Sequence, residues 1–297
     1  MKQLELKALA KINLGLDVLG RRENGYHDVR MVMQSVYLYD DVKIEKKEEK
    51  GVTLQTNLHF LPMDSGNIAY KAAQMLIEEF GIEEGVKITL KKHIPVAAGL
   101  AGGSSNAAAV LFGMNRLFGL HLSREELMER GVKLGADVPY CIMRGTVLAE
   151  GIGEELSELP AMPKCTVLIA KPPISVSTKV VYEALDSKEV LKHPDIDALI
   201  RGLEKGSLTE IAENMGNVLE DVTIPMYPVI EEIKDEMKAC GALGAMMSGS
   251  GPTVFGLFVN RADARKAQMR IRERALAKQV FVTNIHGARR NQDGTQI

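Results

Sequence analysis

The chain has 297 residues, of which 45% are hydrophobic and 26% are charged, an ordinary globular composition. Its 37 basic and 39 acidic residues nearly cancel, which argues against a dedicated nucleic-acid-binding protein. The three cysteines are far apart and form no CxxC pair, and no apolar run approaches the ~20 residues that a membrane helix needs. We therefore expect a cytoplasmic protein with reduced thiols that associates with neither nucleic acid nor membrane.

The first half of the chain mixes strand and helix patterns. Apolar and polar residues alternate over residues 2–19, and the turn-forming pair Asn24–Gly25 follows. Ser123 and Glu126 have the spacing of a capping box at a helix start. The predicted elements of this half are strands at 2–19, 31–46 and 85–95, helices within 63–81, 94–119 and 123–135, and a mixed segment at 135–156.

Composition changes at residues 158–164, where two prolines flank a short connector. We place the domain boundary there, which predicts domains at 1–158 and 164–288 and a flexible tail at 289–297. The predicted elements after the boundary are strands at 165–173 and 278–288, helices at 177–185, 196–206, 208–220, 227–241 and 262–277, and a strand–turn–strand unit at 244–259.

A glycine-rich stretch, GLAGGSS at residues 99–105, separates a predicted strand from a long helix. Glycines let backbone N–H groups approach an anion closely, and the first helical turn has unpaired N–H groups at its positive dipole end. Ser104 and Ser105 can cap the helix or bond a phosphate oxygen or its metal. The alternative is a capped helix after a flexible loop, because neither GxxxxGKS/T nor GxGxxG is present.

A second glycine cluster, MSGSGPTVF at residues 247–255, also adjoins strands. Taken alone, it fits a tight hairpin turn. Two loops rich in serine and glycine are together harder to explain by turns alone, and they can close over one polyanionic ligand.

Three segments in order resemble the GHMP kinase superfamily. They are AKINLGLDVLGRRENGYHD at 10–28, PVAAGLAGGSSNAAA at 95–109 and MSGSGPTVF at 247–255. The second is similar to the family's phosphate loop, Pro-x-x-x-Gly-Leu-x-x-Gly-Ser-Ser/Ala. The first resembles one member, which phosphorylates a cytidine diphosphate polyol in the non-mevalonate isoprenoid pathway. The resemblance covers nearly the whole chain except its last residues.

This resemblance implies a two-domain α/β (α+β) GHMP kinase fold. The N-terminal domain would be a mixed sheet with helices, the C-terminal domain an antiparallel ferredoxin-like sheet with helices, and the active site would lie in the cleft. The pattern of strands and helices alone says only α/β or α+β.

The resemblance also implies transfer of the ATP γ-phosphoryl group to the 2-hydroxyl of the polyol. Asp137 matches the family's base, and Lys11 matches the lysine that keeps this carboxylate ionised and stabilises charge on the attacking oxygen. Taken alone, Asp137 fits a helix cap better and Lys11 fits a solvated lysine of an edge strand. Beside the three matching segments, the catalytic interpretation is favoured.

The phosphate loop would cradle ATP, whose Mg²⁺ would be held mostly by ATP and water. The six histidines show no HExxH spacing, so we expect no protein-built metal site. The purine would lie near Asn67 and Ile68. The ATP-binding residues implied by the resemblance are these two with Pro95, Val96, Ala97, Ala98, Gly99, Leu100, Ala101, Gly102, Gly103, Ser104 and Ser105.

The acceptor site is likewise implied by the resemblance. Tyr26 and His27 match the cytosine contact, Asn13 matches a contact to the polyol, and Tyr182 matches an aromatic residue against the cytosine ring. Thr178 lies four residues before Tyr182, on the same helix face. Taken alone, Tyr182 fits a half-buried helix aromatic and His27 an ordinary loop histidine. The second glycine loop contributes Ser248, Gly249, Ser250 and Gly251.

Three positions depart from the family pattern. The family often has Pro at Leu9, Gly at Ala101 and Asp at Asn106. We expect the methyl group of Ala101 to fit if its φ is negative. We expect the neutral Asn106 to weaken the helix start slightly.

Two other functions stay open. The first is a GHMP kinase for homoserine, mevalonate or a sugar, although GRRENGYHD offers an aromatic ring and an imidazole for a base and no clear clamp for a free carboxylate. The second is a nucleotide-binding protein without turnover, which the presence of both Lys11 and Asp137 argues against. The expected partners are small molecules, ATP and a cytidine diphosphate polyol, and the expected state is a monomer or homodimer.

Overall fold

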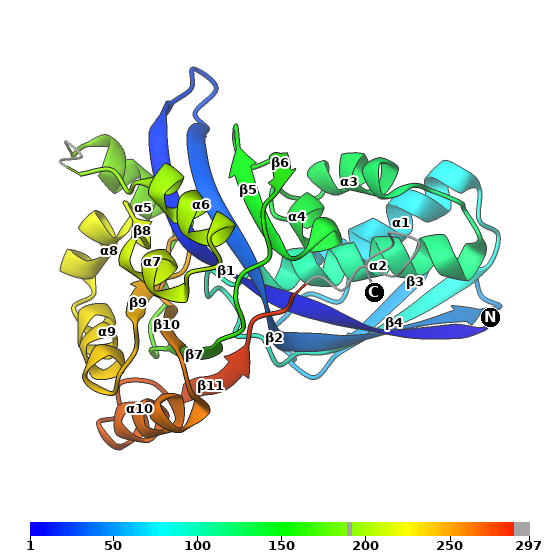
Figure 1. The fold of residues 1–297 in the computed structure, drawn as a ribbon. Helices are drawn as coiled ribbons and strands as arrows, with labels where there is room; N and C mark the ends of the chain where they lie inside the picture. Colours follow the sequence, from blue (N-terminus) through cyan, green and yellow to red (C-terminus); the bar gives the residue numbers. More distant parts are fainter. Residues whose placement is uncertain (189–191, 288–297) are drawn as a thin grey trace. The chain divides into compact units, whose positions relative to one another are not determined.

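The computed structural model describes residues 1–188 and 192–287 (Figure 1). The predicted tail, 289–297, lies outside the described residues. The chain forms two compact units, and each combines several stretches of sequence. The first unit comprises residues 1–10, 38–96 and 101–143, and the second comprises 11–37, 97–100 and residues from 144 onward.

The first unit is a small sheet covered by helices. It contains one end of each long strand, β1 (Gln3–Arg21) and β2 (His27–Lys47), together with β3 (Val52–Thr56), β4 (Gly85–Lys91), α1 (Ile68–Phe80), α2 (Gly102–Phe118), α3 (Arg124–Val132) and α4 (Val138–Met143). Strand β4 pairs antiparallel with β2 and parallel with β3. Helices α1 and α2 lie side by side (Figure 1).

Local sequence explains the helices of this unit. Helix α1 buries Ala69, Ala72, Ala73 and Leu76 on one face, and Asn67 caps its start by accepting a hydrogen bond from the Ala69 N–H at 3.0 Å. It ends at Gly81, which has a left-handed φ of 58°. Helix α2 approaches the sheet at Gly113, where a Cβ would lie 2.4 Å from the Ile44 side chain. A larger residue there would require the Ile44 side chain to move.

The second unit is built on a four-stranded antiparallel sheet, in the order β11 (Gln279–Asn284), β7 (Thr166–Lys171), β10 (Val254–Phe258) and β9 (Gly244–Met247). Helices α9 (Val229–Ala239) and α10 (Arg261–Glu273) pack on this sheet. The unit also contains α5 (Thr178–Asp186), α6 (Ile196–Glu204), α7 (Leu208–Glu213), α8 (Glu220–Met226), β5 (Thr146–Glu150), β6 (Glu155–Glu158) and β8 (Gly216–Asn217).

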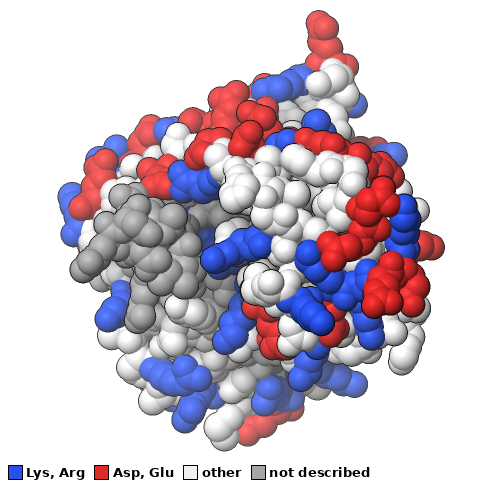
Figure 2. Space-filling view, turned by 90° about the vertical axis from the view of Figure 1, so that its right-hand side faces the viewer, with Lys and Arg blue, Asp and Glu red and all other residues white. Residues whose placement is uncertain are grey.

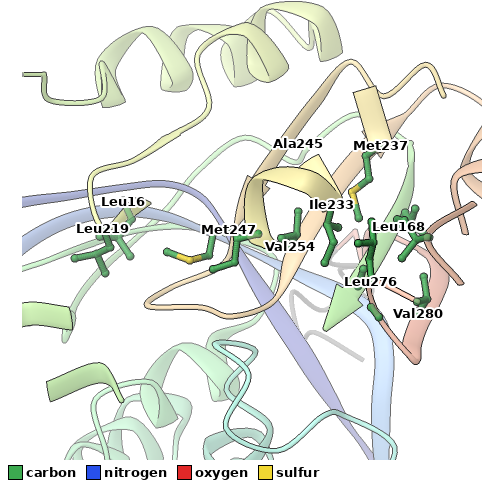
Figure 3. Close-up of a cluster of buried hydrophobic side chains, with 14 of the residues drawn as sticks. Leu16, Leu168, Leu219, Ile233, Met237, Ala245, Met247, Val254, Leu276 and Val280 are labelled. Atoms are coloured by element: carbon green, nitrogen blue, oxygen red, sulfur yellow. The ribbon is translucent and has the colours of Figure 1, made fainter. Parts of the chain in front are cut away.

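The core of the second unit joins this sheet to its helices (Figure 3). Helix α10 contributes Ala264, Ala267 and Ile271, which share one helix face and are fully buried. The sheet contributes alternate residues such as Val254 and Phe258 of β10. Because Met247 of β9 also belongs to this core, the strand that leads into the second glycine cluster is firmly anchored.

The predicted α/β class is confirmed, and so are the capping box at Ser123 and the strand–turn–strand unit at 244–259. The helix predicted at 208–220 is confirmed over its first half and wrong beyond it. Helix α7 ends at Glu213, and the chain then forms β8, which pairs parallel with β1, before α8 begins at Glu220. Strands β3 and β6 were not predicted, because each is short. The domain boundary at 158–164 and the active-site cleft stay predictions.

On the face shown in Figure 2, basic and acidic side chains are interspersed, as the nearly balanced charge suggests. None of the helices described is both long enough and apolar enough to cross a bilayer.

Candidate active site

The predicted phosphate loop, residues 95–105, enters α2 without a side-chain cap. Ala101 occupies the N-cap position, and the helix begins at Gly102. Ser104 and Ser105 therefore lie inside the first turn and do not cap the helix, which leaves the second of their two predicted roles, a bond to a phosphate oxygen or its metal, as a prediction. The Ser105 N–H already bonds the Ala101 carbonyl at 2.8 Å, so the free amides of the turn are those before it. These amides lie at the positive end of a 17-residue helix, a suitable place for a phosphate.

Ala101 adopts a left-handed conformation with a φ of 54°. The condition under which we expected its methyl group to fit without strain, a negative φ, is therefore not met. For a residue with a Cβ, the left-handed conformation is less stable than the right-handed one by roughly 1–2 kcal/mol. At Ala101 the surrounding structure imposes it at the point where the chain turns into the helix. The strain lies at the junction of loop and helix, where the family pattern has glycine.

A buried polar network lies under the start of α2. Asp40 is fully buried and accepts hydrogen bonds from the backbone N–H groups of His93 and Ile94, at 2.7 and 2.8 Å. Its other oxygen accepts from the Lys92 ammonium and from the Asn106 amide. Lys92 also donates to Asn106 at 2.7 Å. Asn106 is thus a buried member of a closed hydrogen-bond network. The slight weakening of the helix start that we expected from its neutral side chain stays a prediction.

The two residues expected near the purine lie at the start of α1. The Asn67 amide donates to the Pro62 carbonyl at 3.0 Å while its oxygen caps the helix. A Cβ at Gly103 would lie 3.6 Å from the Ile68 side chain, so Ile68 adjoins the phosphate loop. The structure therefore brings these predicted residues together within the first unit.

Lys11 and Asn13 form a pair on β1. Lys11 is 5% exposed, and its ammonium donates to the Asn13 side-chain oxygen at 2.7 Å. The Lys11 N–H donates to the Leu100 carbonyl at 3.1 Å, which fixes the strand beside the phosphate loop. A buried lysine with a neutral partner is not the solvated lysine of an edge strand, so that alternative is wrong.

The two glycine loops meet within the second unit. The Ser248 hydroxyl donates to the Gly99 carbonyl at 3.0 Å. A Cβ at Gly99 would lie 2.1 Å from the Ser248 carbonyl oxygen, and Gly99 has a φ of 71°, so this contact needs glycine. A Cβ at Gly249 would lie 3.7 Å from the Asn13 oxygen. The second cluster is thus part of the same site as Lys11 and Asn13, and its turn geometry serves that contact.

The predicted acceptor residues also gather in the second unit. The His27 ring stands 4.7 Å from the Tyr182 ring, tilted by 46°, and its Nε2 pairs with the Asp186 carboxylate at 2.6 Å. Thr178 reaches the Ser250 hydroxyl at 2.8 Å. Tyr26 is 60% exposed, which leaves its ring free to contact a ligand. The helix face of α5 therefore joins the aromatic pair to the second glycine loop.

Asp137 lies in the first unit, directly before α4. Its carbonyl accepts a hydrogen bond from the Cys141 N–H at 3.0 Å, and its side chain is partly exposed. Within residues 1–188 and 192–287, no group of three or more His, Cys, Asp or Glu side chains is placed to hold a metal ion.

Two family models match this sequence, one in its N-terminal half and one in its C-terminal half. The GHMP kinases N terminal domain matches residues 67–145, and the GHMP kinases C terminal domain matches residues 199–276. The chain belongs to the GHMP kinase family. This chain is 56% identical to a Lachnospira eligens protein named 4-diphosphocytidyl-2-C-methyl-D-erythritol kinase, over 95% of this chain and 98% of that protein.

Solved structures agree with this assignment. A crystal structure of 4-(cytidine 5'-diphospho)-2C-methyl-D-erythritol kinase is 32% identical, with a TM-score of 0.81 over 96% of this chain and all of that one. A homoserine kinase from Cytophaga hutchinsonii has a TM-score of 0.77 over 96% of this chain and 95% of that one, at 23% identity. The second likeness concerns the fold alone.

Several residues that shape the site were not predicted. Asp40 lies within β2 and Lys92 directly after β4, both without a recognisable motif. Asp186 directly follows the helix predicted at 177–185, and Asn217 lies within the helix predicted at 208–220. For Asn217 the sequence does hold a signal of the break between α7 and α8. The residues 214–217 include two asparagines and a glycine, which interrupt the helical apolar pattern.

Proposed function

We propose that this GHMP kinase transfers the γ-phosphoryl group of ATP to the 2-hydroxyl of 4-diphosphocytidyl-2-C-methyl-D-erythritol, in the non-mevalonate pathway to isoprenoid precursors. The observation that carries this proposal is the 56% identity over nearly the full length of a relative with that name. The solved structure of a kinase for the same acceptor supports it.

ATP binds with its phosphates at the start of α2. The amides of Gly102 and Gly103 donate to phosphate oxygens, and the helix dipole favours the negative charge. The purine lies by Asn67 and Ile68. The hydroxyls of Ser104 and Ser105 are hard oxygen donors, which fits an Mg²⁺ ion held mainly by phosphate oxygens and water. When bound, this ion neutralises charge on the transferred group.

Proton removal and charge stabilisation fall to two side chains. Asp137 accepts the proton of the acceptor hydroxyl, and its partial exposure leaves the carboxylate available. Lys11 stabilises the negative charge that grows on the attacking oxygen. The hydrogen bond from Lys11 to Asn13 fixes the direction of the ammonium before substrate arrives. Positioning of this kind supplies most of the catalysis in phosphoryl transfer.

The acceptor's cytosine lies against Tyr182 and Tyr26, with hydrogen bonds to His27. The Nε2 atom of His27 pairs with the Asp186 carboxylate, which orients the ring so that its Nδ1 atom is the nitrogen offered to the base. Asn13 contacts the polyol. The enzyme acts in the cytoplasm, in keeping with three buried free cysteines.

A coupled assay of ADP release tests the proposal, with the cytidine substrate compared against homoserine and mevalonate. We expect turnover with the cytidine substrate alone. Lys11→Met and Asp137→Asn should each reduce kcat by about 10² or more while the circular dichroism spectrum is kept. Lys50→Met and Asp221→Asn are matched controls at exposed positions and should keep full activity. Turnover with homoserine and not with the cytidine substrate would reject the acceptor assignment.

A further inference from the structure

A single buried amide holds the second glycine loop. Asn217 of β8 is 6% exposed, and its Nδ2 donates to two backbone carbonyls of the loop, Met247 at 2.9 Å and Gly249 at 2.8 Å. Its Oδ1 accepts from the Leu219 N–H at 3.0 Å. All three bonds are made to backbone, so the amide ties the chain at β8 to two points of the loop on either side of Ser248.

A second contact locks the same end of the loop. The Met247 N–H donates to Glu220 Oε1 at 2.7 Å, and the Lys234 ammonium lies 2.9 Å from Glu220 Oε2. Burial raises the pKa of Glu220, and Lys234 and the Met247 N–H oppose this rise. Both the N–H and the carbonyl of Met247 are therefore bound by side chains from the segment 217–220.

The loop held in this way touches each group of predicted site residues in the second unit. Ser248 bonds the Gly99 carbonyl in the phosphate loop, and Ser250 bonds Thr178 on the acceptor side. Gly249 stands beside Asn13. A shift of the loop would therefore disturb the contacts of both substrates.

We propose that Asn217 is a positioning residue for phosphoryl transfer, which fixes residues 247–251 in the shape that both substrates require. The proposal rests on the proposed function. It assigns to Asn217 no contact with substrate, because all its hydrogen bonds are made within the protein. The sequence pattern predicted a helix at this residue, but it lies in β8, in the break between α7 and α8.

The chemistry of the position requires an amide. An aspartate has the same shape and keeps the acceptor for the Leu219 N–H, but it has no donor and would set a carboxylate against two carbonyl oxygens. A serine keeps one donor but cannot reach two carbonyls. Each change leaves the Met247 or Gly249 carbonyl without its hydrogen-bond donor. We therefore expect the loop to shift until these carbonyls reach another donor or water.

The test compares Asn217→Asp and Asn217→Ser with Asn115→Asp. Asn115 is a partly buried asparagine that also bridges backbone groups, since its amide donates to the Leu122 carbonyl at 2.9 Å and its oxygen accepts from the Leu122 N–H at 3.0 Å. It lies near the far end of α2, away from the phosphate loop. We expect Asn217→Asp to raise the KM for ATP and for the cytidine substrate about tenfold or more, and Asn217→Ser somewhat less, with Asn115→Asp unchanged within about twofold.

Hydrogen exchange of the peptide that contains residues 247–251 gives a readout that needs no substrate. We expect faster exchange in both Asn217 variants and wild-type exchange in Asn115→Asp. If wild-type protein shows no turnover but this exchange pattern is observed, the proposed function fails, whereas the conclusion that Asn217 fixes residues 247–251 is supported. If the folded Asn217 variants keep both KM values and differ only in melting temperature, the role is structural and the proposal is overturned. Failure of both Asn217 variants to fold overturns it equally.

Discussion

Replacing Lys92 by methionine tests the buried network beneath the phosphate loop. The side chains of Lys92 and Asp40 are 5% and 0% exposed, so the pair is shielded from water. Removing one partner of a buried ion pair costs about 3–5 kcal/mol, because it leaves an uncompensated charge. The Asp40 carboxylate would keep three hydrogen bonds, from His93, Ile94 and Asn106. We therefore expect the lower part of this range, about 3 kcal/mol.

Urea unfolding followed by circular dichroism measures this loss. With a slope of about 1–3 kcal/mol per molar urea, the midpoint should fall by about 1 M or more. Lys50→Met is the matched control, because Lys50 pairs with Glu83 at the surface, where the side chains are 75% and 80% exposed. We expect no measurable change of the midpoint there.

A double variant separates charge from packing. Asp40→Asn with Lys92→Met removes both charges and should recover a large part of the stability that Lys92→Met loses, because no bare carboxylate is left in the interior. If Lys92→Met unfolds at the same urea concentration as wild type, the pair is hydrated in solution and the reasoning is refuted.

Three further predictions concern single residues. Gly99→Ala should cost more than about 4 kcal/mol, because its Cβ would lie 2.1 Å from a carbonyl oxygen; thermal unfolding would show this, whereas Gly20→Ala, with open space around it, should change little. Ala101→Gly should stabilise the protein by up to about 1 kcal/mol by relieving a left-handed alanine, and a lower melting temperature would contradict this. Burial raises the pKa of Cys165 to about 12, so at pH 8 its thiol should resist thiol reagents until urea is added; rapid labelling of native protein would disprove it.

The elements with strong local signals were predictable. The start and end of α1 follow from Asn67 and Gly81, and the capping box of α3 from Ser123 and Glu126. These features are set by residues within one helical turn of each other, so their physics is present in the sequence. The helix predicted at 208–220 ends early, at Glu213, because Gly and Asn at 214–217 favour a helix only weakly and Gly216 pairs with Gly15 of β1.

The candidate site likewise contains features that were predictable from the sequence and features that were not. The sequence by itself determined the glycine loops, the alternation that sets Lys11 beside Asn13, and the family to which these motifs belong. Only the tertiary structure decided that Asp40 and Asn217 support those loops, that Gly99 meets Ser248, and that Ala101 is left-handed. A hydrogen bond between residues tens of positions apart leaves no periodic mark in the chain, because its energy depends on distance and burial that exist only after folding.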